Sequence, residues 1–282
     1  MTQGSAKPAA VEAAANRVEI AALRARIHAL ERGARDAGAD RLRILPLGLR
    51  ALDDHLPGGG LPLSCLHEIE GERREWDDGV ATGFCLALLA RLCAAPPDST
   101  GGGPLLWVAR WRDLYPPGLI ALGLDPGRLI LVRAGGEAEV LWAMEEALRC
   151  ARLAAVVGEV ESLPRSAGRR LQLAAETGGV TAFLLRRRLR PARRAEEPSV
   201  AATRWRIAPA RFSARPAAPG AAAGRLPGPP RWQAELLRCR GAAPGRWLLE
   251  WDDATGGFAL AAALRDGPLV PAPGRRGARY CQ

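Results

Sequence analysis

LPLGLRALDDHLPGGGLPLSCLHEIEGERREWDDGVATGF, residues 45–84, is the stretch that decides the fold. A Gly-x-x-x-Leu-Asp segment begins at Gly48, and a Gly-Gly-Leu-Pro turn begins at Gly59. The short apolar run 66–69 follows, then a charged loop, then an apolar helical pattern over 79–92. This order predicts a buried strand that leads through a loop into a helix.

The pattern continues on the C-terminal side of this stretch. Further strands are predicted at 104–109, 129–132, 154–157 and 180–185, and helices at 117–122, 137–149 and 165–176. Buried strands that alternate with helices of this length indicate an α/β fold, with a mostly parallel sheet flanked by helices. Two more strands are predicted at 233–239 and 247–251, and the turn 252–257 leads into 258–262 as a β-hairpin.

Composition divides the chain into four parts. Residues 1–40 read as a tail and an N-terminal amphipathic helix, and residues 41–207 as the core. Residues 208–231 are rich in Pro, Ala and Gly and predict a linker, and residues 232–282 predict a C-terminal β extension with a basic tail.

The N-terminal helix has one narrow apolar stripe, formed by Ile20, Leu23, Ile27 and Leu30. A narrow, heptad-like stripe suits a single partner helix or groove, so these residues are candidates for partner binding. The alternative is that the stripe folds back on its own domain.

Charge and cysteine content limit the classes of function. The net charge of +10 and the pI near 10.4 favour a polyanion as partner, with nucleic acid as the first candidate. The six cysteines and three histidines show no metal-ligand spacing, so no metal site is expected. There is no apolar run long enough to cross a membrane and no signal-peptide pattern, so we expect a cytoplasmic protein.

The 45–84 stretch resembles the entry to the RecA core, where the same two motifs precede a strand that ends in a phosphate-binding loop. The resemblance continues at Gly123-Leu124-Asp125, before the strand at 129–132, and at Gly136-Glu137, which open a helix. It covers residues 44–207 and implies a RecA-like core.

The phosphate-binding loop itself is degenerate. Such a loop needs a lysine for the phosphates and a Ser or Thr hydroxyl for magnesium. The loop begins at Gly71, but Gly79, Val80 and Ala81 stand where the family has Gly-Lys-Thr, and the chain's one lysine is Lys7. We therefore expect these four positions not to hold a nucleotide.

The catalytic carboxylates of the family are also missing. Arg110 stands in the place of the catalytic glutamate, and Gly158 in the place of the aspartate linked to magnesium. Glu159 comes one residue late and is interpreted as a carboxylate of a turn or a helix start. The sequence therefore predicts no cofactor and no catalytic activity.

One basic segment follows the strand at 180–185, where RecA has its second DNA-contacting loop. Guanidinium groups suit phosphates by their charge and forked geometry, so this loop is a candidate for binding single-stranded DNA. The alternative is a solvated loop without a ligand. The candidate residues are Arg186, Arg187, Arg188, Arg190, Arg193 and Arg194.

The degenerate loop, the Gly-Gly-Leu-Pro entry and the segment from Trp247 to Thr255 together resemble the ImuA family, a RecA-like accessory protein of the bacterial SOS mutagenesis cassette. The resemblance implies a non-catalytic factor in translesion DNA synthesis, associated with the nucleoid when DNA is damaged. It implies as partners an ImuB-like protein of the polymerase family, RecA and an error-prone DNA polymerase III alpha subunit. The alternative is a SulA-like inhibitor of cell division that binds a tubulin-like protein. SulA-type proteins are shorter, which counts against it.

Overall fold

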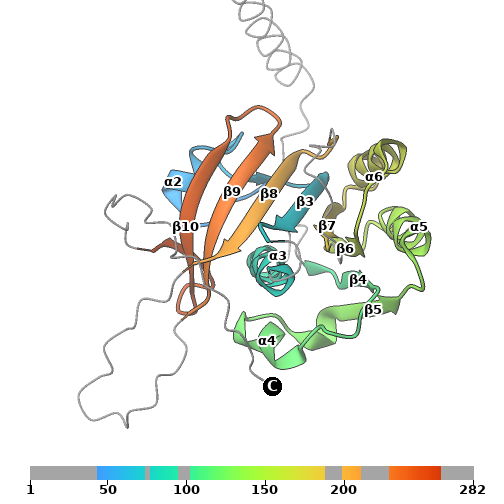
Figure 1. Cartoon of the computed structure of the whole chain (residues 1–282), viewed down its shortest axis with the longest axis horizontal. Coiled ribbons are helices and arrows are strands. Elements are labelled where there is room, and N and C mark those ends of the chain that lie inside the picture. The colour runs from blue at the N-terminus through green and yellow to red at the C-terminus, as the bar shows by residue number, and fades with distance from the viewer. Residues whose placement is uncertain (1–42, 74–76, 95–101, 188–198, 211–228, 262–282) are drawn as a thin grey trace, which may run out of the picture.

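The computed structural model describes residues 43–73, 77–94, 102–187, 199–210 and 229–261. Strands β1 (Ile44–Leu45) and β2 (Leu61–Pro62) form a small antiparallel pair. The main sheet (Figure 1) contains nine strands in the order β11-β10-β9-β8-β3-β7-β6-β4-β5. These strands are β3 (Leu66–Gly71), β4 (Leu105–Ala109), β5 (Leu129–Arg133), β6 (Ala155–Val160), β7 (Thr181–Arg186), β8 (Thr203–Pro209), β9 (Arg231–Cys239), β10 (Gly245–Asp252) and β11 (Gly257–Leu260).

Helix α2 (Arg50–Asp53) lies between β1 and β2. The helices between the parallel strands are α3 (Asp78–Cys93), α4 (Pro116–Ala121), α5 (Glu137–Ala147) and α6 (Arg165–Gly178), with a short 3-10 turn, η2 (Pro126–Arg128), after α4. The strands from β8 across to β5 all run parallel, and β9, β10 and β11 each run antiparallel to their neighbours. The prediction of an α/β fold with a mostly parallel sheet is confirmed, and every strand and helix predicted between residues 66 and 185 is present.

The sheet separates two apolar cores. Helix α3 lies against one face, and α5 and α6 lie against the other (Figure 1). Side chains of a strand point alternately to the two faces, so Ile69 of β3 packs on the α3 side and Leu66 on the α5–α6 side. Both β3 and β7 are buried along their whole length, as expected for central strands covered on both faces.

The three C-terminal strands continue the main sheet. Ring centroids of Phe84 on α3 lie 5.8, 6.0 and 5.7 Å from those of Trp205, Trp232 and Phe258, so strands on both sides of the range 211–228 share one core. The predicted hairpin through 252–257 is confirmed by the antiparallel pairing of β10 with β11. Ala208 and Pro209, which composition assigned to the linker, belong to β8 because they pair with β9.

Several predicted features lie outside the described residues: the N-terminal tail and helix with Ile20, Leu23, Ile27 and Leu30, most of the 208–231 range, and the basic tail. Among the helices that the structure does describe, none is both long and apolar enough to span a membrane.

Candidate functional site

Strands β3, β4, β6 and β7 end at the same edge of the sheet, which we call the carboxyl edge. In open parallel sheets ligands bind outside this edge. A groove of about 590 Å³ opens here between α3 and α4, and its lining includes Gly79, Tyr115, Glu159 and Arg187. This edge is therefore the place to look for a functional site.

Arg187 is the centre of a charged cluster at the carboxyl edge. Its Nη1 donates a 3.0 Å hydrogen bond to Asp113 and lies 3.3 Å from Oε1 of Glu159, and its Nε lies 3.6 Å from Asp78. The ring of Trp111 lies 4.7 Å from the guanidinium carbons of both Arg187 and Arg110. We call Arg187, Asp78, Asp113, Glu159 and Trp111 the Arg187 cluster. It joins β6, β7, the start of α3 and the segment after β4.

Glu159 corrects the sequence interpretation, which placed it in a turn or at a helix start. Strand β6 runs on to Val160, so Glu159 is a strand residue, and only 1% of its side chain is exposed. It accepts hydrogen bonds from the indole Nε1–H of Trp107 at 3.0 Å and from the backbone N–H of Arg110 at 3.2 Å. Its charge is therefore satisfied inside the fold.

Gly158 stands where the resemblance to RecA would place a magnesium-linked aspartate. It faces α5, on the side of the sheet opposite to Glu159. A Cβ atom built there would lie 2.1 Å from the Sδ of Met144 on α5. The glycine thus allows α5 to approach β6. A larger residue at this position would require the Met144 side chain to move and would press on Val140.

A buried carboxylate, Asp77, lies between β3 and α3, beside the end of β3. Asp77 is 1% exposed and accepts the backbone N–H of Arg73 at 2.9 Å. The Arg73 guanidinium binds the same carboxylate through Nε at 3.2 Å and Nη2 at 3.0 Å. A Cβ on Gly71 would lie 3.0 Å from Asp77, so the glycine permits this approach.

The cluster shifts the acidity of its members. Burial raises the pKa of Asp78 to about 6, against the lowering effect of Arg187. The hydrogen bond from Arg187 lowers the pKa of Asp113. The pKa of Arg187 itself is raised, because the hydrogen bond to Asp113 and the charges of Glu159, Asp113 and Asp78 together outweigh its burial.

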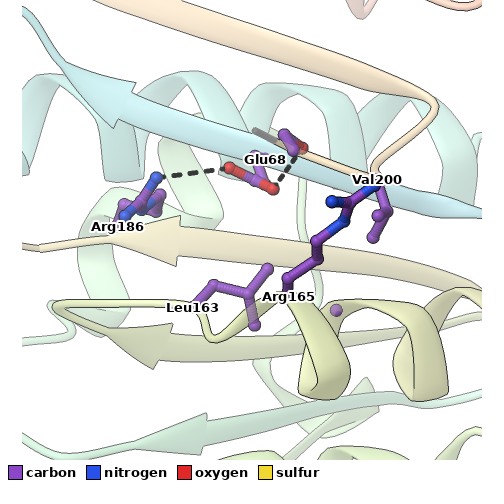
Figure 2. Close-up of a pocket in the computed structure, with 7 residues that line it drawn as sticks. Glu68, Leu163, Arg165, Arg186 and Val200 are labelled. Atoms are coloured by element: carbon purple, nitrogen blue, oxygen red, sulfur yellow. Dashed lines mark hydrogen bonds and ion pairs between the residues drawn. The ribbon is translucent and has the colours of Figure 1, made fainter. Parts of the chain in front are cut away.

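The predicted DNA-contacting arginines divide into two groups. Arg186 ends β7 with 4% exposure, and its Nη1 lies 3.6 Å from Oε2 of Glu68 (Figure 2). Arg187 belongs to the cluster described above. Both guanidinium groups are thus engaged by carboxylates of the fold. The other candidates, Arg188, Arg190, Arg193 and Arg194, lie outside the described residues.

The space beside Glu68 and Arg186 is too small for a ligand. Leu163, Arg165 and Val200 close around it (Figure 2), and its volume is about 10 Å³, which is room for about one water molecule. The Glu68 carboxylate also accepts a hydrogen bond from the hydroxyl of Ser199.

One cysteine–histidine contact lies at the opposite edge of the sheet. The Sγ of Cys65 is 3.5 Å from Nε2 of His67, which also lies 2.9 Å from the carbonyl oxygen of Pro62. Burial raises the pKa of Cys65 to about 12 and lowers the pKa of His67 to about 4. A neutral thiol beside a neutral imidazole is a poor nucleophile pair. Within the described ranges no group of three His, Cys, Asp or Glu side chains could hold a metal ion.

Sequence reasoning missed the carboxylates that bind Arg187, although a signal was present. Glu159 and Asp113 come near the ends of predicted parallel strands, and Asp78 opens a helix after another. Because such ends meet at one edge, these side chains were candidates to converge on the arginine after β7.

Comparison with known proteins gives one clear relationship. The chain is 41% identical over 242 residues to "Protein ImuA" from two Caulobacter vibrioides strains, NA1000 / CB15N and ATCC 19089, covering 83% of this chain and 95% of each relative. No family model matches the chain. Among solved structures, it is similar to SulA from Pseudomonas aeruginosa with 26% identity and a TM-score of 0.37, covering 43% of this chain and 96% of that one.

Proposed function

The chain belongs to the ImuA family, and we propose that it is a non-catalytic accessory factor in SOS-inducible translesion DNA synthesis and mutagenesis. The identity extends over 83% of this chain and 95% of the Caulobacter relatives. A role in the same process as those relatives is the simplest reading of this coverage.

The observation that supports the non-catalytic part is that carboxylates of the fold already pair with the N–H and guanidinium groups near the start of α3. Asp77 accepts a hydrogen bond from the backbone N–H of Arg73, and three carboxylates form ion pairs with the guanidinium of Arg187. Val80 and Ala81 supply neither charge nor hydroxyl at the start of α3. A triphosphate would have to displace an internal carboxylate and approach three more, which opposes binding.

The factor then acts through contacts with other proteins. The partners in this proposal are an ImuB-like protein of the polymerase family, RecA and an error-prone DNA polymerase III alpha subunit, with single-stranded DNA as a further ligand of the loop after β7. The protein would work in the cytoplasm, at the nucleoid when DNA is damaged.

Two measurements test this function. Deleting the gene in its own host should lower the frequency of mutations after ultraviolet damage, and the wild-type copy should restore it. An unchanged mutation frequency in the deletion strain would refute the role. Purified protein should neither bind nor hydrolyse ATP, and Val80→Lys combined with Ala81→Thr should not create turnover, because phosphoryl transfer needs the whole constellation of positioned charges.

A further inference from the structure

The groove at the carboxyl edge has the features of a peptide-binding surface. Its lining includes three glycines, Gly79 and Gly83 on α3 and Gly118 on α4, so an extended chain could approach both helices closely. Tyr115, which is 70% exposed, and Pro229 and Pro230 also line it. Grooves with aromatic and apolar walls suit extended segments, and proline-rich ones in particular.

The groove is also acidic, in a chain whose net charge is +10. Among the described residues that line it, three are carboxylates, Asp113, Glu159 and Asp253, and one is a cation, Arg187, which pairs with Asp113 and Glu159. Asp253 is exposed in the turn between β10 and β11. This balance disfavours a nucleotide or a nucleic acid as occupant and favours a cationic one.

The chain itself contains a segment of the matching chemistry. Residues 262–282 carry four arginines and one aspartate, and within them GPLVPAPGRR spans residues 267–276. Pro268 and Pro271 form a P-x-x-P pair of the kind that favours the polyproline II conformation, and Arg275 and Arg276 follow shortly after. A proline-rich stretch followed by a cationic pair is complementary to a groove with apolar walls and an acidic end.

The segment is long enough to reach the groove. Asp253 lines the groove, and β11 leads away from that turn for four residues, about 13 Å at the rise of a β-strand. In a polyproline II conformation the residues from Ala261 to Pro268 would span about 22 Å, which is enough to return to the groove from the end of β11. We propose that residues 262–282 dock in the groove between α3 and α4 of their own chain.

The test is a cross-link within the full-length chain. Cysteines are introduced by Val270→Cys in the segment and Gly118→Cys in the groove lining, in a background carrying Cys150→Ser and Cys281→Ser. A Cβ at position 118 meets only the Tyr115 ring at 3.5 Å, an ordinary contact, so α4 should accept it. The matched control moves the second cysteine to Leu173→Cys, which is 63% exposed on α6, across the sheet.

The docked segment should form the intramolecular disulfide at least tenfold faster with position 118 than with position 173, because docking raises the local concentration to the order of millimolar. The rate should fall severalfold in 1 M NaCl, and also with Arg275→Glu and Arg276→Glu. Rates are followed by non-reducing electrophoresis and intact mass.

Equal rates of disulfide formation at the two positions would overturn the proposal. A covalent dimer whose yield falls on dilution would also overturn it, because a second chain would then supply the segment. Ala121→Cys, which also lines the groove, gives an independent readout should position 118 disturb α4. A negative cross-linking result says nothing about the mutation frequency of the deletion strain. Failure of the docking proposal can therefore be distinguished from failure of the proposed function.

Discussion

Removing the guanidinium at the centre of the Arg187 cluster should destabilise the fold strongly. The side chain of Arg187 is 14% exposed and that of Glu159 only 1% exposed. Arg187→Met keeps most of the side chain's apolar stem but leaves Glu159 buried without a cation. Breaking a buried ion pair in this way costs about 3–5 kcal/mol. Asp113 is half exposed, so its lost pair adds only about 0.5 kcal/mol.

Glu159 keeps two N–H donors, from Trp107 and Arg110, which places its penalty at the lower end of that range. We therefore expect Arg187→Met to lower the free energy of unfolding by about 3–4 kcal/mol at pH 7. Urea unfolding followed by tryptophan fluorescence measures it. With an m-value of about 2.5 kcal/mol/M, the midpoint should fall by about 1.4 M.

Two further variants separate the charge from the packing. Glu159→Gln in the Arg187→Met background removes the orphaned charge and should recover about 2 kcal/mol, a coupling that a double-mutant cycle reports. Arg50→Ala breaks the exposed pair with Asp54, whose side chains are 92% and 68% exposed, and should change stability by less than about 0.5 kcal/mol. A loss below about 1 kcal/mol for Arg187→Met, or no recovery in the double variant, would refute the reasoning.

Three other predictions follow from the same chain. Asp78→Asn should remove a pH dependence: the pKa of Asp78 near 6 lies above its unfolded value, so the folded parent holds a proton that the unfolded chain releases. The parent should gain about 1–2 kcal/mol over the variant between pH 7 and pH 4 in urea unfolding, after allowance for solvent screening; parallel pH profiles would contradict this. Changing Arg188, Arg190, Arg193 and Arg194 to Ala should weaken binding of single-stranded DNA in fluorescence anisotropy and flatten its salt dependence, whereas unchanged affinity would leave that loop without a role in DNA binding. Deleting residues 1–36 should keep the melting temperature but abolish partner binding in pull-downs, since we expect the Ile20, Leu23, Ile27 and Leu30 stripe to dock on a partner; unfolding of the isolated truncated protein would place that stripe in the core.

The parallel half of the sheet could be predicted because its signals are local. A run such as 154–157 is apolar on both faces and bounded by turns, which identifies a central strand without knowledge of its neighbours. The C-terminal end of this strand was harder to predict. Glu159 is charged, and a charge ordinarily ends a buried strand, so the sequence predicts the strand to Val157 and Glu159 as a carboxylate of a turn or a helix start. The Trp107 indole, the backbone N–H of Arg110 and the Arg187 guanidinium, all distant in sequence, make a buried carboxylate acceptable there.

The place of the C-terminal strands could not be predicted for a similar reason. The alternation of Trp232, Ala234 and Leu236 indicates a strand with one buried face. Nothing in that alternation says that β9 pairs with β8 rather than with a separate sheet. The pairing is decided by Phe84 and the aromatic side chains around it, which come together only once the sheet forms.

The internal charges at the carboxyl edge bear on how such a protein can be controlled. In a parallel sheet the strand ends and the following helix leave N–H groups and side chains that a bound ligand commonly satisfies. Here Asp77 accepts the backbone N–H of Arg73, and the Arg187 guanidinium pairs with the buried carboxylate of β6, so these groups find partners among the described residues without a ligand. A segment that docks in the groove would bias a conformational change there only if it contacted one state better than the other. The acidic lining and the glycines of α3 and α4 favour an extended, cationic segment as that occupant.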